Sequence, residues 1–235
     1  MISTKQRSTA PEIMDDFAME GEILKEALDK IAQINHLLGG NKLTLQSLKI
    51  LLENHDKSKN ITIADIGCGN GDMLREIADF GHENKYAFNL IGIDANLFTI
   101  EYAKELSKEY KNINFICQDI FDKSFNEIKY DIVLCTLTLH HFKSNEIKKI
   151  LTLFYTNSVF GIVINDLHRS KAAYYLFYMV CKVFGLNEMS KQDGLTSILR
   201  GFKRQELIDF STVLNFKKFS IQWKWAFRYQ WIIKK

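Results

Sequence analysis

The sequence predicts a doubly wound α/β fold, with a mostly parallel sheet of seven strands between two layers of helices. Three observations support this prediction. Short β-branched runs alternate with helical stretches between residues 61 and 165, an order typical of a parallel sheet covered on both faces. A helical segment precedes the alternation and predicts an N-terminal cap. Two alternating, aromatic-rich runs end the chain and predict an antiparallel hairpin at the sheet edge.

The composition is that of one globular domain. Of the 235 residues, 46% are hydrophobic and 25% are charged, and the net charge of +3 is too small to indicate a nucleic-acid partner. The N-terminal residues contain no apolar core of a signal peptide, and the apolar stretch 172–185 is interrupted by Lys182. We therefore expect a cytoplasmic protein without a membrane span. Four widely separated cysteines predict reduced thiols and no metal site.

The N-terminal cap is expected to contain two helices or more. Apolar residues recur at helical spacing over residues 11–36, and Gly21 is a point at which this run can split. The glycine pair at 39–40 ends the run, and a second helix is expected over residues 44–53.

The central alternation and the chain end supply the strands of the sheet. The expected strands are residues 61–66, 90–94, 114–118, 131–135 and 159–164, with a final hairpin within 219–233 that turns near 226–228. The expected helices between them are residues 72–80, 97–110 and 145–156.

The alternation breaks after residue 165. An aromatic-rich helix is expected over residues 171–184, then a loop that contains Gly194 and Gly201, then a helix over residues 203–214. The aromatic helix is interpreted either as part of the core or as a lid over an apolar substrate.

The most informative segment is residues 65–72, where a strand, a tight glycine turn and a helix start follow one another. Glycines permit positive φ and close approach of a ligand, and the helix start offers free N–H groups. The pattern is D-x-G-x-G-x-G, and Asp72 stands where the dinucleotide fingerprint requires glycine. Acids at both ends disfavour a pyrophosphate and a nicotinamide dehydrogenase, and they suit a ligand with a positive charge.

Two further acids follow the next two strands. Asp94 lies roughly 20 residues after the glycine turn, where a carboxylate can accept hydrogen bonds from ribose hydroxyls. Asp119 follows the third strand and can accept from an adenine amino group, with Gln118 beside it. The carboxyl ends of parallel strands meet at one edge of the sheet, so the sequence predicts a nucleoside site there.

Together these residues resemble the class I S-adenosylmethionine-dependent methyltransferases, whose fold is Rossmann-like. The resemblance covers about residues 61–165 and rests on the glycine turn, Asp94, the Gln118–Asp119 pair and the strand 130–135 that leads into Leu139-His140-His141-Phe142. It implies S-adenosylmethionine as the cofactor and a methyl transfer as the reaction. It also implies a single domain, divided into an N-terminal cap (1–58), a cofactor-binding core (59–165), a substrate-lid insert (166–215) and C-terminal strands (216–235).

The resemblance implies roles for individual residues. Gly67 and Gly69 would lie against the amino-acid half of the cofactor, Asp94 would hold the ribose, and Asp119 would contact the adenine. Each of these could instead be a turn glycine or a helix cap. The full set expected to contact the cofactor is Asp65, Gly67, Cys68, Gly69, Asn70, Asp94, Ala95, Gln118, Asp119, Ile120 and Cys135.

The acceptor is less well defined by the sequence. Residues 163–170 and 193–200 are similar to a bacterial subgroup that often acts in quinone, polyketide or aryl-pigment biosynthesis. This similarity favours a small aromatic or quinone-like acceptor in secondary metabolism. An RNA methyltransferase and a cofactor-binding homologue without activity remain as alternatives, although the chain contains no dense basic patch.

Three histidines follow strand ends and are candidate general bases: His140, His141 and His168. A phenol has a pKa of about 10, so a positioned histidine would assist its methylation at neutral pH. Alternatively, His140 or His141 caps a loop or packs under the cofactor, and His168 is a surface residue that pairs with Asp166.

Overall fold

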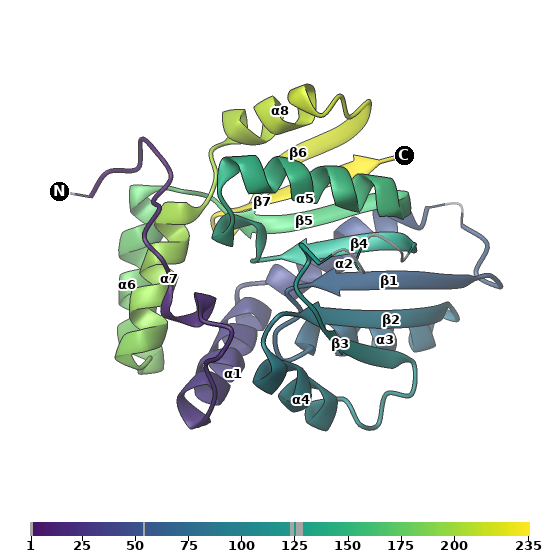
Figure 1. The fold of residues 1–235 in the computed structure, drawn as a ribbon, viewed down its shortest axis with the longest axis horizontal. Coiled ribbons are helices and arrows are strands. Elements are labelled where there is room, and N and C mark those ends of the chain that lie inside the picture. The colour runs from purple at the N-terminus through teal and green to yellow at the C-terminus, as the bar shows by residue number, and fades with distance from the viewer. Residues whose placement is uncertain (1, 54, 123–124, 126–128) are drawn as a thin grey trace.

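The computed structural model describes every residue except 1, 54, 123–124 and 126–128 (Figure 1). In this part of the chain, seven strands form one sheet in the order β3-β2-β1-β4-β5-β7-β6. β1 to β5 are parallel, whereas β7 runs antiparallel to β5 and β6 runs antiparallel to β7. The predicted α/β fold and the C-terminal edge hairpin are therefore confirmed.

The elements agree with the predicted alternation. The strands are β1 (Asn60–Ile66), β2 (Ala87–Asp94), β3 (Ile113–Cys117), β4 (Tyr130–Thr136), β5 (Ser158–Leu167), β6 (Lys218–Lys224) and β7 (Arg228–Lys234). The helices are η1 (Ile13–Asp15), α1 (Glu22–Leu37), α2 (Gly40–Leu51), α3 (Asp72–Asn84), α4 (Leu97–Leu106), η3 (Leu139–His141), α5 (Ser144–Asn157), α6 (Lys171–Phe184), α7 (Glu188–Arg200) and α8 (Arg204–Val213).

Hydrophobic side chains fill both faces of the sheet. In β1, Ile61 and Ile63 belong to a buried cluster that α2 and α3 complete, whereas Ala64 and Ile66 belong to the cluster on the opposite face, which α5 and α8 complete. Successive side chains of a strand point to opposite faces, so a strand buried on both sides is apolar throughout. This explains why the β1 sequence lacks a polar alternation.

The start of α2 differs from the prediction. Gly39 adopts a left-handed φ of 76° and separates the two helices, but α2 already begins at Gly40 rather than at Thr44. Its Leu48 and Leu51 lie in the sheet core, and the helix packs on β5 and β7. The second helix of the predicted cap therefore covers a face of the sheet.

The predicted loop around Gly194 is wrong, because these residues form α7. The side chain of Asn187 caps this helix by accepting a hydrogen bond from Ser190 N at 2.8 Å. A Cβ on Gly194 would lie 2.3 Å from the ring of Phe177 in α6. The glycine allows two helices to pack closely, and a sequence alone does not distinguish this role from a loop.

Four helical elements gather at the carboxyl ends of the parallel strands. Figure 1 shows α1, α6 and α7 on that side of the sheet, with the N-terminal segment and η1 running alongside α7. Ser8 N donates to Leu199 O at 2.9 Å, which ties this segment to α7. Among the described residues, no helix combines the length and the hydrophobicity that a bilayer crossing requires.

Candidate functional site

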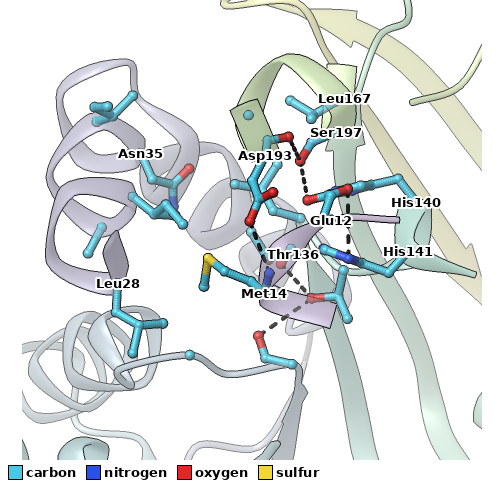
Figure 2. A pocket seen from close by; sticks show the side chains of 18 of the residues that line it. Glu12, Met14, Leu28, Asn35, Thr136, His140, His141, Leu167, Asp193 and Ser197 are labelled. Atoms are coloured by element: carbon cyan, nitrogen blue, oxygen red, sulfur yellow. Dashed lines mark hydrogen bonds and ion pairs between the residues drawn. The ribbon is translucent and has the colours of Figure 1, made fainter. Parts of the chain in front are cut away.

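A cavity of about 770 Å³ opens at the carboxyl ends of the parallel strands. Its walls come from the turn after β1, the ends of β2 and β3, the segment after β4, and α1, α6 and α7, and Figure 2 shows part of it. The three candidate histidines line it. The predicted cofactor residues that also line it are Asp65, Gly67, Cys68, Gly69, Asn70, Asp94, Ala95, Gln118, Asp119 and Ile120.

Cys135 is not among the lining residues. It is 1% exposed and belongs to the core cluster on the α5 face of the sheet. The next residue, Thr136, lines the cavity instead, because neighbouring side chains of β4 point to opposite faces. The structure therefore places the side chain of Cys135 in the core and Thr136 at the cavity.

The glycine turn keeps its backbone open toward the cavity. Gly67 and Gly69 have φ values of 70° and 53°, which residues other than glycine rarely adopt. A Cβ on Gly67 would lie 2.4 Å from Oγ1 of Thr138, in the segment that follows β4. Glycine at this position therefore allows the ends of β1 and β4 to approach each other.

Acidic side chains surround the turn. Asp94 accepts hydrogen bonds from Gly69 N at 3.2 Å and from Asn96 N at 3.0 Å, and burial raises its pKa. Asp65 is 2% exposed, and its Oδ1 has no hydrogen-bond partner among the described residues. Burial, together with the charges of Asp72 and Asp94, raises the pKa of Asp65 well above its usual value. A positively charged ligand would relieve this unfavourable concentration of carboxylates.

The other predicted contacts link the turn to its surroundings. Asn70 donates a hydrogen bond to Asp29 of α1 at 3.1 Å, so the turn is held against the helix that covers the cavity. Asp119 accepts from Phe121 N at 2.9 Å, and Gln118 N donates to the backbone oxygen of Asp94 at 2.9 Å. The ends of β1, β2 and β3 thus form one connected surface.

His140 forms a buried pair with Asp166. Its Nδ1 lies 2.7 Å from Oδ1 of Asp166, and its backbone N–H donates to Oδ2 at 3.1 Å. Burial raises the pKa of Asp166, but the interaction with His140 outweighs this effect and holds the pKa below its usual value. A carboxylate only accepts hydrogen bonds, so Nδ1 carries the proton and the lone pair is on Nε2. That atom is buried and has no hydrogen-bond partner among the described residues.

His141 forms a second such pair with an acid from the N-terminal segment. Its Nδ1 lies 2.6 Å from Oδ1 of Asp15, and the other oxygen of Asp15 lies 2.6 Å from Nη1 of Arg200. Burial raises the pKa of Asp15, but the hydrogen bonds from His141 and Arg200 outweigh burial and leave it below its usual range. The two histidine rings lie 4.3 Å apart, so the pairs are neighbours.

The N-terminal segment and α7 contribute functional candidates that the sequence analysis missed. Glu12 is 6% exposed and accepts a hydrogen bond from Ser197 Oγ at 2.5 Å. Asp193 accepts from the backbone N–H of Ile13 at 2.7 Å and from that of Met14 at 3.0 Å, the second of which Figure 2 shows. These partners are far apart in the sequence and belong to no local motif. The polar residues around η1 and in α7 were the only signal of these contacts in the sequence.

His168 is held differently. Its Nδ1 accepts a hydrogen bond from Nε1 of Trp223 at 3.1 Å, because the indole N–H can only donate. Its lone pair is therefore engaged, and Nε2 carries the proton when the ring is neutral. Burial, with the charges of Lys203 and Arg169, lowers the pKa of His168. The alternative that His168 pairs with Asp166 is wrong, because Asp166 pairs with His140.

One cluster has the spacing of a metal site. Glu12, His140 and His141 each place one potential ligand atom within 4.8 Å of the other two. However, Nη1 of Arg200 lies 3.4 Å from the Glu12 oxygen that would be the ligand. Burial raises the pKa of Glu12, although the charges of His141 and Arg200 oppose this effect, and we interpret the cluster as an ion-pair network around Arg200 rather than as a metal site.

One wall of the cavity is apolar. Leu176, Phe177, Val180 and Val183 of α6 line it, and only Ala173 and Cys181 of this helix are buried. The interpretation of α6 as core is therefore wrong, and the helix forms a wall of the cavity. Such a wall suits an apolar or aromatic ligand.

A family model described as a methyltransferase domain matches residues 57–199. Carboxy-S-adenosyl-L-methionine synthase of Helicobacter pylori (strain G27) is 25% identical over 173 residues, which is 70% of this chain and 71% of the relative. Protein-lysine N-methyltransferase EFM4 of Saccharomyces cerevisiae is 35% identical over 85 residues, which is 35% of each chain. The chain spans about a third of the length of EFM4 and of a viral relative that it also matches.

Solved structures show the same fold. The plantazolicin methyltransferase BpumL in complex with SAH superposes with a TM-score of 0.69 at 18% identity, over 90% of both chains. Magnesium protoporphyrin IX methyltransferase (ChlM) from Synechocystis PCC 6803 with bound SAM superposes with a TM-score of 0.56 at 14% identity, over 94% of this chain and 89% of that chain. Because the family model spans more than half of the sequence, this chain belongs to the methyltransferase domain family.

Proposed function

We propose that this protein transfers a methyl group from S-adenosylmethionine to a small apolar or aromatic acceptor. One observation carries the proposal: the glycine turn with Asp94, and the pair of His140 with Asp166, meet at one cavity. The turn accounts for the cofactor, which is S-adenosylmethionine. The histidine pair and the apolar wall of α6 account for the acceptor.

The residues at the turn fit this cofactor. Asp65 has a buried oxygen with no hydrogen-bond partner among the described residues, and burial beside Asp72 and Asp94 raises its pKa and disfavours its charged form. A nearby cation would stabilise that charged form, and S-adenosylmethionine carries an ammonium and a sulfonium. Gly67 and Gly69 leave the backbone open to the amino-acid half. We assign the ribose hydroxyls to Asp94 and the adenine amino group to Asp119, because both carboxylates line the cavity beside the turn. When bound, the cofactor supplies a methyl group on a sulfonium, which an acceptor removes by in-line displacement.

His140 is the general base that the geometry favours. With Nδ1 donating to Asp166, the lone pair of the neutral ring is on Nε2, which makes no hydrogen bond with a described residue, although Oε1 of Glu12 lies 3.8 Å from it. His140 lines the cavity, and Asp166 fixes the ring orientation and the tautomer. His168 is less suited, since Trp223 already donates to its Nδ1. His140 would take the proton of an acceptor hydroxyl, and Asp166 would stabilise the imidazolium that forms.

The test separates cofactor binding from turnover. Calorimetric titration of the whole chain with S-adenosylhomocysteine and with NAD should show binding of the first and not of the second. Labelled S-adenosylmethionine would then be offered with phenols, quinols and aromatic acids, and the products identified by mass spectrometry. Binding of NAD without binding of S-adenosylhomocysteine would overturn the proposal. Cofactor binding with no transfer to any acceptor would instead support the homologue without activity.

A further inference from the structure

Arg228 is a buried cation with hydrogen-bond donors that no described residue satisfies. It begins β7, is 4% exposed and lines the cavity. Its Nε and Nη1 are buried and make no hydrogen bond with any residue that the structure describes. By contrast, two other arginines of the described residues, Arg169 and Arg200, form ion pairs with carboxylates.

This arrangement is unfavourable unless a ligand completes it. Arginine is almost never fully buried unless it is paired, because the desolvation of a charge is costly. Burial lowers the pKa of Arg228 to about 10, which leaves the guanidinium charged at neutral pH. The carboxylate whose charge acts on it, Asp166, is itself hydrogen-bonded to His140 and to Leu167 N. Asp166 therefore balances part of the charge but does not accept the Arg228 hydrogen bonds.

The space beside the guanidinium belongs to the cavity. A Cβ on Gly40 would lie 3.1 Å from Cζ of Arg228 and even closer to Oδ1 of Asn35, so both side chains pack against this glycine. Asn35 also lines the cavity, where Figure 2 shows it on α1, and its Oδ1 is buried with no hydrogen-bond partner in the described part of the chain. Asn35 is uncharged, so it cannot neutralise Arg228. Two unsatisfied polar groups thus adjoin the same part of the cavity.

The sheet order assigns this position to the acceptor rather than to the cofactor. β7 is the third strand from β1, in the order β1-β4-β5-β7, and neighbouring strands lie about 4.8 Å apart, so the separation is roughly 14 Å. The glycine turn follows β1, whereas Arg228 pairs across the sheet with Leu167, next to the Asp166 that holds His140. Arg228 is therefore on the side of the proposed base.

We propose that Arg228 binds a carboxylate of the methyl acceptor, which makes the acceptor an apolar or aromatic carboxylic acid. This inference rests on the proposed function and narrows its substrate class. The apolar wall around Phe177 and Val180 would hold the body of the acceptor, and a guanidinium is suited to bidentate recognition of a carboxylate. The alternative is that a buried water accepts the Arg228 hydrogen bonds and that Arg228 has no role in acceptor recognition, and the experiment must distinguish this from carboxylate binding.

The test uses a charged probe and its neutral counterpart. The chain is saturated with S-adenosylhomocysteine and titrated by NMR with benzoate and, separately, with benzamide. We expect benzoate to bind at least about tenfold more tightly than benzamide, and the Arg228 Nε–Hε resonance to shift with benzoate. In Arg228→Gln the preference should disappear. In the control Lys224→Gln, which removes a charge on the adjacent strand outside the cavity lining, the preference should persist.

The outcomes separate the two proposals. If the wild-type chain does not bind S-adenosylhomocysteine, the proposed function fails. If it does bind, but benzoate and benzamide bind equally or the preference survives Arg228→Gln, the carboxylate inference alone is overturned. Should Arg228→Gln fail to fold, Arg228→Lys retains the charge without the bidentate fork, and the wild-type comparison with its Nε–Hε shift decides the question.

Discussion

The two halves of the cavity are built in different ways. The half that we propose for the cofactor, called the cofactor half below, consists of the turn after β1 and the ends of β2 and β3, and its residues lie between Asp65 and Ile120. The half that we propose for the acceptor, called the acceptor half, combines η1, the segment after β4, the end of β5, α6, α7 and the start of β7. The first half is one continuous stretch of chain, whereas the second brings both ends of the chain together.

The difference also appears in the electrostatics. In the cofactor half, carboxylates such as Asp65 and Asp94 lie close together, and their pKa values are raised by burial. In the acceptor half, Asp15 and Asp166 are paired with histidines and have lowered pKa values. Charge remains uncompensated where a cationic cofactor would bind. It is mostly compensated within the protein where the acceptor would bind, although Arg228 and Oε1 of Glu12 have no hydrogen-bond partners among the described residues and burial raises the pKa of Glu12.

The largest effect is expected in the acceptor half, at His140. His140→Gln should lower kcat by about 10²–10⁴, because a positioned general base is typically worth that much, while the affinity for S-adenosylhomocysteine stays nearly constant. Steady-state kinetics with the acceptor and calorimetry with S-adenosylhomocysteine measure the two quantities. For a phenolic acceptor the loss should shrink at high pH, where the acceptor ionises unaided. A parallel loss of cofactor affinity would show that the two halves are not separable.

A glycine in the cofactor half should give the next largest effect. Gly67→Ala places a Cβ 2.4 Å from Thr138 in a residue with positive φ, so it should destabilise the fold by roughly 1–3 kcal/mol and weaken S-adenosylhomocysteine binding. Urea unfolding and calorimetry provide the measurements. Gly185→Ala is a matched control, with a φ of 59° and no atom within 4 Å of the added Cβ. Equal costs for the two variants would mean that the contact with Thr138 is unimportant.

Asp94 tests the predicted ribose contact. Asp94→Ala removes a charged acceptor, and hydrogen bonds to charged groups are worth about 1.5–3 kcal/mol, so S-adenosylhomocysteine affinity should fall at least about tenfold. Asp79→Ala, which changes an exposed acid of α3 outside the cavity lining, is the control. Wild-type affinity in a folded Asp94→Ala variant would remove this residue from the cofactor half.

The paired acids predict a pH dependence of stability in the acceptor half. The folded-state pKa values of Asp15 and Asp166 lie below their unfolded values, so their ion pairs contribute stability above a pH of about 4 and lose it as the pH falls further. The contribution of these two pairs to the free energy of unfolding should therefore decrease from pH 5 to pH 3, whereas Asp65 and Asp94, whose pKa values are raised, contribute in the opposite direction. Asp15→Asn should lower stability at pH 7 and flatten this dependence, whereas Asp16→Asn, at its exposed neighbour, should not. An unchanged slope in Asp15→Asn would contradict the assignment.

The smallest effect is expected at His168. Because Trp223 engages its Nδ1, His168→Gln should change kcat by less than about threefold, in contrast to His140→Gln. The same assay measures both variants. A loss at His168 as large as that at His140 would transfer the base role to His168 and reverse the assignment within the acceptor half.

The sequence by itself determined the sheet and the cofactor half. Its alternating β-branched runs and helices are local patterns, and the glycines and acids of the turn lie in a single segment that any doubly wound sheet brings to the same edge. Cys135 shows the limit of this reasoning, because its neighbour Thr136 faces the cavity and only the pleat of β4 decides which of the two does.

Only the tertiary structure decided the acceptor half. Glu12 meets Ser197, Asp15 meets His141 and Arg200, and Arg228 packs against Gly40, although these partners are distant in the chain. Gly194 indicated a loop in the sequence and serves helix packing in the fold. The assignment of His140 rather than His168 as the base rests on two hydrogen bonds, that of His140 with Asp166 of β5 and that of His168 with Trp223 of β6. Such contacts arise from packing rather than from local propensity, so no pattern in a single sequence encodes them.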